Sequence, residues 1–217
     1  MPPKGTVRHN RVGEKHVTKQ GYEVEIIEYI SSLNSTIKFN DERGTILYNI
    51  EYDRIKRGTV VCPYHPNKYN GYIGQGKYKS SVNKVDVYPY KVWTDMLKRV
   101  YSEKYHKIKP TYIGISLCEE WRNYQNFAGW WEENYKDYMQ GWHLDKDIIC
   151  PECRTYSPET CAILPEEING MFISSKSYRG SLPIGVTKHK KHYETYFRGK
   201  FLGYSSCLLY TSDAADE

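Results

Sequence analysis

Long apolar segments are missing from this sequence. No run approaches the length needed to cross a bilayer, and the N-terminal stretch MPPKGTVRHNRVGEKH has no hydrophobic core of the kind that defines a signal peptide. Cysteines are few as well. Without Cys207, five remain, an odd number in a chain with no export signal, so we expect no disulfide framework. These absences predict a soluble protein that stays inside the cell.

The last eleven residues, CLLYTSDAADE at positions 207–217, lack any periodicity and complete no pattern before them. They match the translation of a nucleotide string that resembles a common transposase adaptor, so we expect a sequencing artefact and a missing natural C-terminus. An ordinary acidic tail is the alternative. Without these residues 23 acidic side chains face 31 basic ones, and the formal charge rises from +5 to +8. Such a surplus suits a polyanionic partner, although many ordinary proteins carry one.

Aromatic residues are plentiful, with 22 tyrosines and five tryptophans interleaved with lysine and arginine. Aromatics mixed with bases can line a nucleic-acid surface. Tyrosine also fills half-buried positions in small modules with thin cores, and that second interpretation is the stronger one.

The first 80 residues predict a flexible basic arm followed by a small β module. Residues 1–20 are polar and without period, which favours a loose arm. Within 21–80, three short runs rich in Ile, Val, Thr and Tyr are separated by turn-forming residues and predict antiparallel strands. These runs are residues 22–29, 35–39 and 45–52. The stretch 62–80, dense in Pro, Gly and Asn, is expected to be loop, with its glycines forming turns rather than a phosphate cradle.

Two helices are expected in the middle of the chain. Apolar residues recur at helical spacing over 90–101, which predicts an amphipathic helix. Ser116 and Glu119 have the spacing of a capping box and predict the start of a second helix. After them, aromatic residues recur every three or four positions, a stripe that is more typical of a core than of a ligand site. The stripe comprises Trp121, Tyr124, Phe127, Trp131 and Tyr135.

Residues 141–170 favour the order strand, strand, helix. A strand-like WHLDKDI leads to a hairpin tip near Pro151, and Pro165 with two acids after it suits the first turn of a short helix. Together with the N-terminal strands, this order predicts an α+β protein: a small β unit, an aromatic-rich helical middle leading into a ββα element, and a C-terminal three-stranded antiparallel sheet.

The region 88–172 resembles the phage and bacterial HNH endonucleases of the homing type, and we assign residues 81–172 to an HNH-like domain with its preceding helices. The resemblance rests on the order and spacing of several short pieces. They are residues 93–101, LCEEWRNYQNF at 117–127, LDKDI at 144–148, YSPETC at 156–161, and 165–169.

That resemblance implies a metal-dependent phosphodiester hydrolase acting on duplex DNA, with Mg²⁺ or a similar ion bound by carboxylate, His or Asn ligands. It places His143, Asp145, Lys146 and Thr160 at the catalytic positions. Lys146 stands where the family has its general base and Thr160 where it often has Asn. A lysine with an unperturbed pKa of about 10.4 is protonated at neutral pH. His143, Asp145 and Asp147, which alternate along one strand face, are the candidate metal ligands.

A structural zinc site is the alternative for this block. The CPEC pair, Cys150 and Cys153, would bind zinc together with Cys161 and either His143 or Cys62. No second close pair of ligands follows, so a hairpin with coincidental cysteines is favoured.

The C-terminal segment 173–206 predicts a small basic module. Between residues 175 and 206 seven bases face a single acid, Glu194, over three strand-like runs. The segment resembles the ethylene-response-factor type of DNA-binding domain, truncated before its helix, which implies a sheet that enters the major groove. The expected DNA-binding residues are Arg179, Lys188, Lys190, Lys191, Tyr193, Arg198 and Lys200.

The sequence therefore carries two hypotheses of function. The first is an HNH-type endonuclease of duplex DNA, located in the cytoplasm of a bacterial host if a phage encodes it. The second is a DNA-binding regulatory protein whose nuclease site has decayed, which accounts for Lys146 and Thr160 directly. A structural protein with no nucleic-acid role is the remaining alternative.

Overall fold

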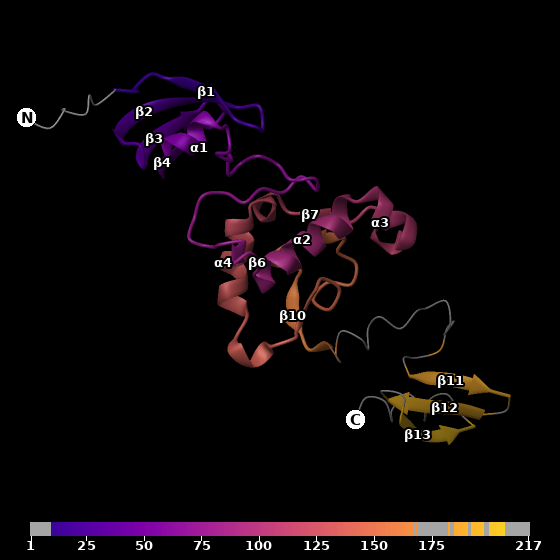
Figure 1. Ribbon diagram of the computed structural model, residues 1–217. Coiled ribbons are helices and arrows are strands. Elements are labelled where there is room, and N and C mark those ends of the chain that lie inside the picture. Colours follow the sequence, from indigo (N-terminus) through magenta and orange to yellow (C-terminus); the bar gives the residue numbers. More distant parts are fainter. Residues whose placement is uncertain are drawn as a thin grey trace, which may run out of the picture. The chain divides into compact units, whose positions relative to one another are not determined.

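Figure 1 shows the computed structural model of the chain, which describes residues 10–166, 168, 182, 185–190, 192–197 and 200–206. The fold is mixed α+β, with an N-terminal four-stranded antiparallel sheet, an aromatic-rich helical middle and a C-terminal three-stranded antiparallel sheet. The chain divides into two compact units, Met1–Thr111 with Glu119–Ala128 and Tyr112–Cys118 with Gly129–Glu217. Across the described residues, every helix is too short or too polar to span a bilayer.

The N-terminal sheet has the strand order β1-β2-β3-β4, and each strand runs antiparallel to its neighbour. The strands are β1 (Lys15–Val17), β2 (Glu23–Ser31), β3 (Asn34–Phe39) and β4 (Ile46–Ile50), followed by the short helix α1 (Tyr52–Lys56). Val24 and Ile26 of β2 point into a core with Ile37 of β3 and Ile55 of α1, because alternate residues of a strand share a face. The three predicted strands are confirmed.

Strand β1 lies in the segment that we expected to be a loose arm. It pairs antiparallel with β2, Lys15 opposite Glu25 and Val17 opposite Glu23. The Gly13 amide also donates to the Ile26 carbonyl at 2.8 Å. The three residues of β1, Lys15–Val17, are too few and too polar to show a strand-like alternation in the sequence. The segment is a strand because it pairs with β2.

The predicted loop 62–80 is a loop over most of its length, and two of its glycines serve different purposes. Gly74 has a φ of +72°, a conformation that favours glycine. Gly71 lies against the helix α2 (Tyr88–Tyr101), where an added Cβ would come within 2.4 Å of Leu97 and 2.7 Å of Trp93. The glycines therefore allow turning and close packing, and they form no phosphate cradle between a strand and a helix.

Helix α2 confirms the helix predicted over 90–101. Its buried side chains are Trp93, Met96, Leu97 and Val100. The indole nitrogen of Trp93 donates to the carbonyl oxygen of Trp121 at 2.7 Å, so the buried polar group is satisfied. A short helix, α3 (Glu103–Ile108), follows, with the Ser102 hydroxyl accepting from the Tyr105 amide.

The second predicted helix begins later than its capping-box pattern indicated. Ser116 lies in strand β7 (Ser116–Leu117) and Glu119 in a 3₁₀ turn, whereas helix α4 spans Tyr124–Asn134. The side chain of Asn123 accepts the Gln125 amide at 3.0 Å and supplies the N-terminal cap instead. The interpretation of the aromatic stripe as core is confirmed, because its first four members are buried. They are Trp121, Tyr124, Phe127 and Trp131.

The second unit contains two small sheets before the C-terminal one. Strands β8 (His143–Asp145) and β10 (Ala162–Leu164) pair antiparallel, whereas β7 pairs parallel with β9 (Thr155–Tyr156). After Pro165 the described residues Glu166 and Ile168 are helical, and the rest of the predicted helix lies outside the described residues.

The C-terminal sheet confirms the three predicted strands. Strands β11 (Val186–His189), β12 (His192–Phe197) and β13 (Lys200–Ser205) form an antiparallel meander, drawn in yellow in Figure 1. The remaining short elements are β5 (Ser81–Val82), β6 (Val85–Asp86) and the 3₁₀ turns η1 (Pro110–Tyr112), η2 (Glu119–Arg122) and η3 (Asp137–Met139).

Candidate functional site

The first candidate site is strand β8 and the turn that follows it. His143 and Asp145 flank the buried Leu144 and share the opposite face of the strand, as predicted. The strand ends at Asp145. One oxygen of this carboxylate accepts the backbone amides of Asp147 at 2.8 Å and Ile148 at 2.9 Å. Asp145 is therefore a turn-forming residue, since aspartate side chains commonly accept amides two or three positions further on.

The expected ligand set does not form a metal group here. In the part of the chain that the structure describes, His143, Asp145 and Asp147 are not among the side chains close enough to share an ion. Strand β8 ends at Asp145, so the alternation that was expected to bring Asp147 to the same face does not reach that residue. Asp147 instead forms an ion pair with Lys146, whose side chain is 9% exposed. These residues, as placed, do not fit a shared divalent ion.

Thr160 has a local structural role. Its hydroxyl donates to the Thr155 carbonyl at 2.7 Å and accepts the Ser157 amide at 3.1 Å. Ser157 and Thr160 thus close the turn between β9 and β10. The hydroxyl oxygen is engaged in that turn, and nothing in the geometry aims it at His143 or Asp145.

The cysteines are arranged differently from either expectation. Cys150 and Cys153 form a disulfide, although the sequence predicted no disulfide framework, and neither sulfur is available for zinc in this state. The spacing of the two cysteines in CPEC is compatible with a zinc site and with a disulfide, so it could not distinguish them. Burial raises the pKa of the Cys161 thiol to about 12, so that thiol is protonated at neutral pH. Cys62 lies in the N-terminal unit, where its sulfur lies 3.9 Å from an Asp41 oxygen.

The C-terminal sheet has two unlike faces. On one face Val186 pairs with Thr195 and Lys188 pairs with Tyr193. Val186 is 2% exposed and Thr195 is 1% exposed, so this face is buried at that end. Lys188 is exposed, and its ammonium lies 5.9 Å from the centre of the Tyr193 ring. Two of the predicted DNA-binding residues therefore share the inward face.

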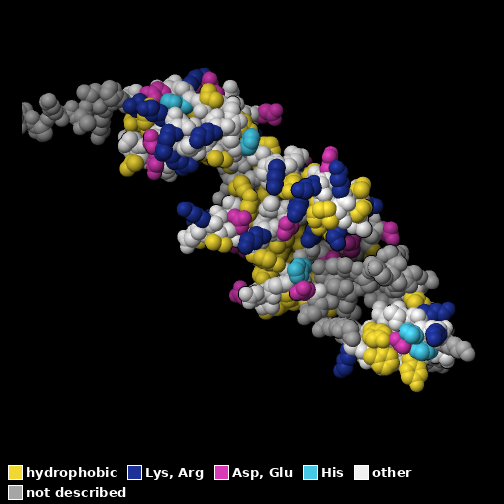
Figure 2. Space-filling model, turned by 45° about the vertical axis from the view of Figure 1, so that its right-hand side comes forward, with side chains coloured by type: hydrophobic (Ala, Val, Ile, Leu, Met, Phe, Trp, Pro, Cys, Tyr) yellow, Lys and Arg dark blue, Asp and Glu magenta, His cyan; other side chains and the backbone are white. Residues whose placement is uncertain are grey.

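The opposite face carries polar and aromatic side chains toward solvent. His189 pairs with His192 and Thr187 with Glu194 across the β11–β12 hairpin. The aromatic members of this face are Tyr196, Phe201 and Tyr204. Histidine, lysine and hydrophobic side chains lie side by side at the surface of this sheet in Figure 2. None of the residues of this face was predicted as a site, although the HKKH string places two histidines across a two-residue turn.

The other predicted DNA-binding residues lie at the ends of the sheet or outside the described residues. Lys190 is exposed in the β11–β12 turn with a φ of +43°, and Lys200 is exposed at the start of β13. Arg179, Lys191 and Arg198 lie outside the described residues.

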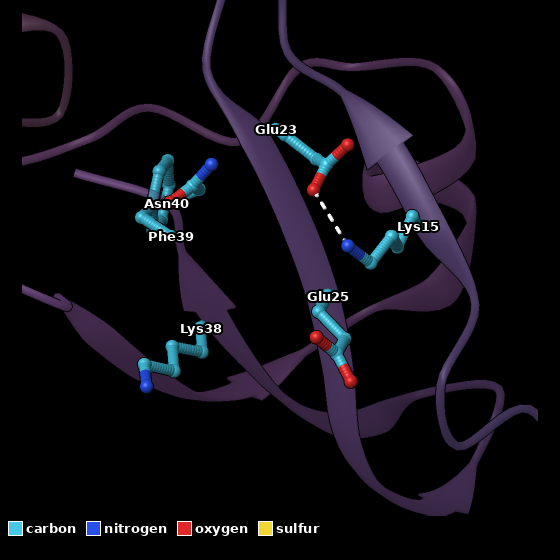
Figure 3. Close-up of a pocket in the computed structure, with 6 residues that line it drawn as sticks. All are labelled: Lys15, Glu23, Glu25, Lys38, Phe39 and Asn40. Atoms are coloured by element: carbon cyan, nitrogen blue, oxygen red, sulfur yellow. Dashed lines mark hydrogen bonds and ion pairs between the residues drawn. The ribbon is translucent and has the colours of Figure 1, made fainter.

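A shallow pocket opens on the N-terminal sheet (Figure 3). Its charged lining residues are Lys15, Glu23, Glu25 and Lys38, with Phe39 and Asn40 beside them. Lys15 already bonds Glu23 at 2.9 Å. Two bases and two acids give the pocket no net charge of either sign, so it offers no preference for a polyanion.

Comparisons of the chain with protein-family models, with curated proteins and with solved structures found no match.

Proposed function

We propose that this protein binds duplex DNA and that the β11–β13 sheet makes the contact. One observation carries the proposal: residues 175–206 hold seven bases against one acid, and all the described lysines among them are exposed. They are Lys188, Lys190 and Lys200. A concentration of positive charge on a small sheet attracts phosphates, because each neutralised phosphate releases condensed counterions.

The two faces of the sheet suggest how DNA would approach it. Val186 and Thr195 are buried, so the face they share is the less accessible one. The other face presents His189 and His192 together with aromatic rings, groups that can donate hydrogen bonds to base edges or stack on bases. In this arrangement Lys190 and Lys200, at opposite ends of the sheet, would contact phosphates on either side.

A salt titration tests the proposal. Binding of a labelled DNA duplex, measured by fluorescence anisotropy at several salt concentrations, should weaken as salt rises, and the slope reports phosphate contacts. The double variant Lys190→Ala/Lys200→Ala, which removes both proposed phosphate contacts, should bind more weakly and lower the slope by about 2, roughly 1 for each lost contact. Lys56→Ala, an exposed lysine of α1, is the matched control and should leave the slope unchanged. Equal slopes for the control and the double variant would contradict the proposal.

Hydrolysis of DNA is the second candidate function. It is favoured by the HNH-like order of β8, β10 and the helical residues after Pro165, and by His143 and Asp145 on one strand face. Because His143, Asp145 and Asp147 do not fit a shared ion, we derive no catalytic step from them. Nicking of supercoiled plasmid with Mg²⁺ or Mn²⁺, abolished in His143→Ala, would establish this activity. Salt-sensitive binding without nicking would leave the DNA-binding function alone.

A further inference from the structure

Three side chains that can bind metal gather on the outward face of the β11–β12 hairpin. They are His189, His192 and Glu194, and each offers one ligand atom within 4.8 Å of the other two. In the part of the chain that the structure describes, no other set of three such residues comes together. Two imidazoles and one carboxylate are the donor types found in three-ligand zinc sites.

The hairpin register brings these residues together. His189 is the last residue of β11 and His192 the first of β12, and they form a cross-strand pair around a two-residue turn. Their rings lie nearly parallel, with centres 5.8 Å apart. Glu194 is two positions along β12 and therefore on the same face. The backbone itself fixes the three Cβ positions, so the cluster does not depend on a flexible loop.

Glu194 is held in its ionised form toward the histidines. One carboxylate oxygen lies 3.0 Å from Nε2 of His192, and the other accepts the Tyr196 hydroxyl at 2.8 Å. These two hydrogen bonds, that from His192 being the larger influence, hold the pKa of Glu194 below its usual range. Tyr196 acts as a positioning residue, since it fixes the orientation of the carboxylate.

We propose that His189, His192 and Glu194 bind one divalent transition-metal ion of the zinc class. Zinc bound at about 2.0–2.1 Å by tetrahedral ligands needs ligand atoms roughly 3.3 Å apart, so small side-chain rotations would close the present spacing. Imidazole nitrogen favours zinc, nickel or copper over magnesium, which prefers oxygen ligands. A fourth position, open to solvent, would hold water.

Such an ion would change the charge of the basic module. Glu194 is the one acid between residues 175 and 206, and an ion of charge +2 beside it would reverse the sign at that point of the face. The inference does not require that the sheet bind DNA. Metal binding can be measured in the absence of nucleic acid.

Cobalt substitution in the untagged full-length chain tests the site. Co²⁺ in a site of low coordination number absorbs visible light, and Zn²⁺ added afterward should displace it and abolish the band. We expect one ion per chain. Loss of a residue that only hydrogen-bonds a metal ligand typically weakens metal binding about 10- to 100-fold. His189→Ala removes a direct ligand, so it should weaken Co²⁺ binding at least as much.

Two further variants separate loss of a ligand from loss of the fold. His189→Cys replaces one zinc-class ligand with another and should retain a cobalt band, shifted by the thiolate. His106→Ala removes a half-buried histidine from helix α3, where its ring bonds only the Arg99 carbonyl among the contacts described, and should bind cobalt as the parent chain does. If His189→Ala binds cobalt as tightly as the parent, or if His106→Ala abolishes binding instead, the proposed site is wrong.

Discussion

The β8–β10 block and the C-terminal sheet use their polar side chains in opposite ways. In the block, Asp145 and Thr160 hold turns, and Lys146 is nearly buried beside Asp147. On the outward face of the C-terminal sheet, His189 and His192 meet across two strands and remain open to solvent. The difference shows that a residue of the right type at the right spacing is a candidate site only if local structure leaves its donor atoms available.

The largest effect is expected from a charge placed on the inward face of the C-terminal sheet. Val186→Asp puts an unpaired carboxylate at a position that is 2% exposed, which should destabilise the sheet by about 3 kcal/mol or more. Thermal unfolding followed by circular dichroism measures the loss. Thr187→Asn, at the next residue and on the exposed face, introduces a side chain the size of aspartate without a second negative charge opposite Glu194, so it is the control and should change the midpoint little. Similar losses of thermal stability in both variants would mean that the two faces of the sheet do not differ in burial.

Substitution of Asp145 should cause an intermediate loss of stability. The size of this loss distinguishes a turn-forming role of Asp145 from a catalytic one. Asp145→Ala removes the acceptor for two backbone amides and should destabilise the chain by about 1–3 kcal/mol. Asp145→Asn keeps an acceptor oxygen and should retain most of the stability. Urea unfolding of both variants makes the comparison. If both variants keep the parent's stability while nicking activity disappears, Asp145 serves chemistry and not the turn.

The smallest effect concerns the reactivity of the cysteines. The raised pKa of Cys161 and its burial predict slow alkylation by iodoacetamide in the folded protein, because the thiolate is the reactive form. After mild reduction Cys150 and Cys153, which are partly exposed, should react before the buried Cys161. Peptide mass spectrometry at increasing times gives the order. Raising the pH toward 12 should speed labelling of Cys161, since a group with a raised pKa loses its proton only there. Early labelling of Cys161 would contradict its buried position.

The sequence predicted those elements that composition or a helical period marks clearly. Strands β2 to β4 were found because they are short runs rich in Ile, Val, Thr and Tyr between turn-forming residues, and helix α2 because its apolar residues recur at helical spacing. Strand β1 has neither signal, and its structure depends on antiparallel pairing with the strand that follows it, β2. Helix α4 was misplaced because the Ser116–Glu119 pattern is local, whereas the true cap, Asn123, lies beside a loop that approaches from elsewhere in the sequence.

The candidate sites were harder to predict than the strands that carry them. Type and spacing identified His143 and Asp145 as neighbours on one face, which is correct, but could not show that β8 ends before Asp147. In the C-terminal sheet, Lys188 was predicted from the excess of basic residues and Tyr193 from the resemblance to the ethylene-response-factor type of domain. The face on which they lie depends on the register of β11 with β12, and this register pairs Val186 with the buried Thr195.

The division of the chain into compact units has a practical consequence for anyone who dissects it. Residues 112–118, which include β7, belong with the C-terminal unit, yet they precede the 119–128 segment of the N-terminal one. The polypeptide thus passes between the units three times, and helix α4 is shared by both at Ala128 and Gly129. No single cut by a protease or a cloning boundary can release either half intact.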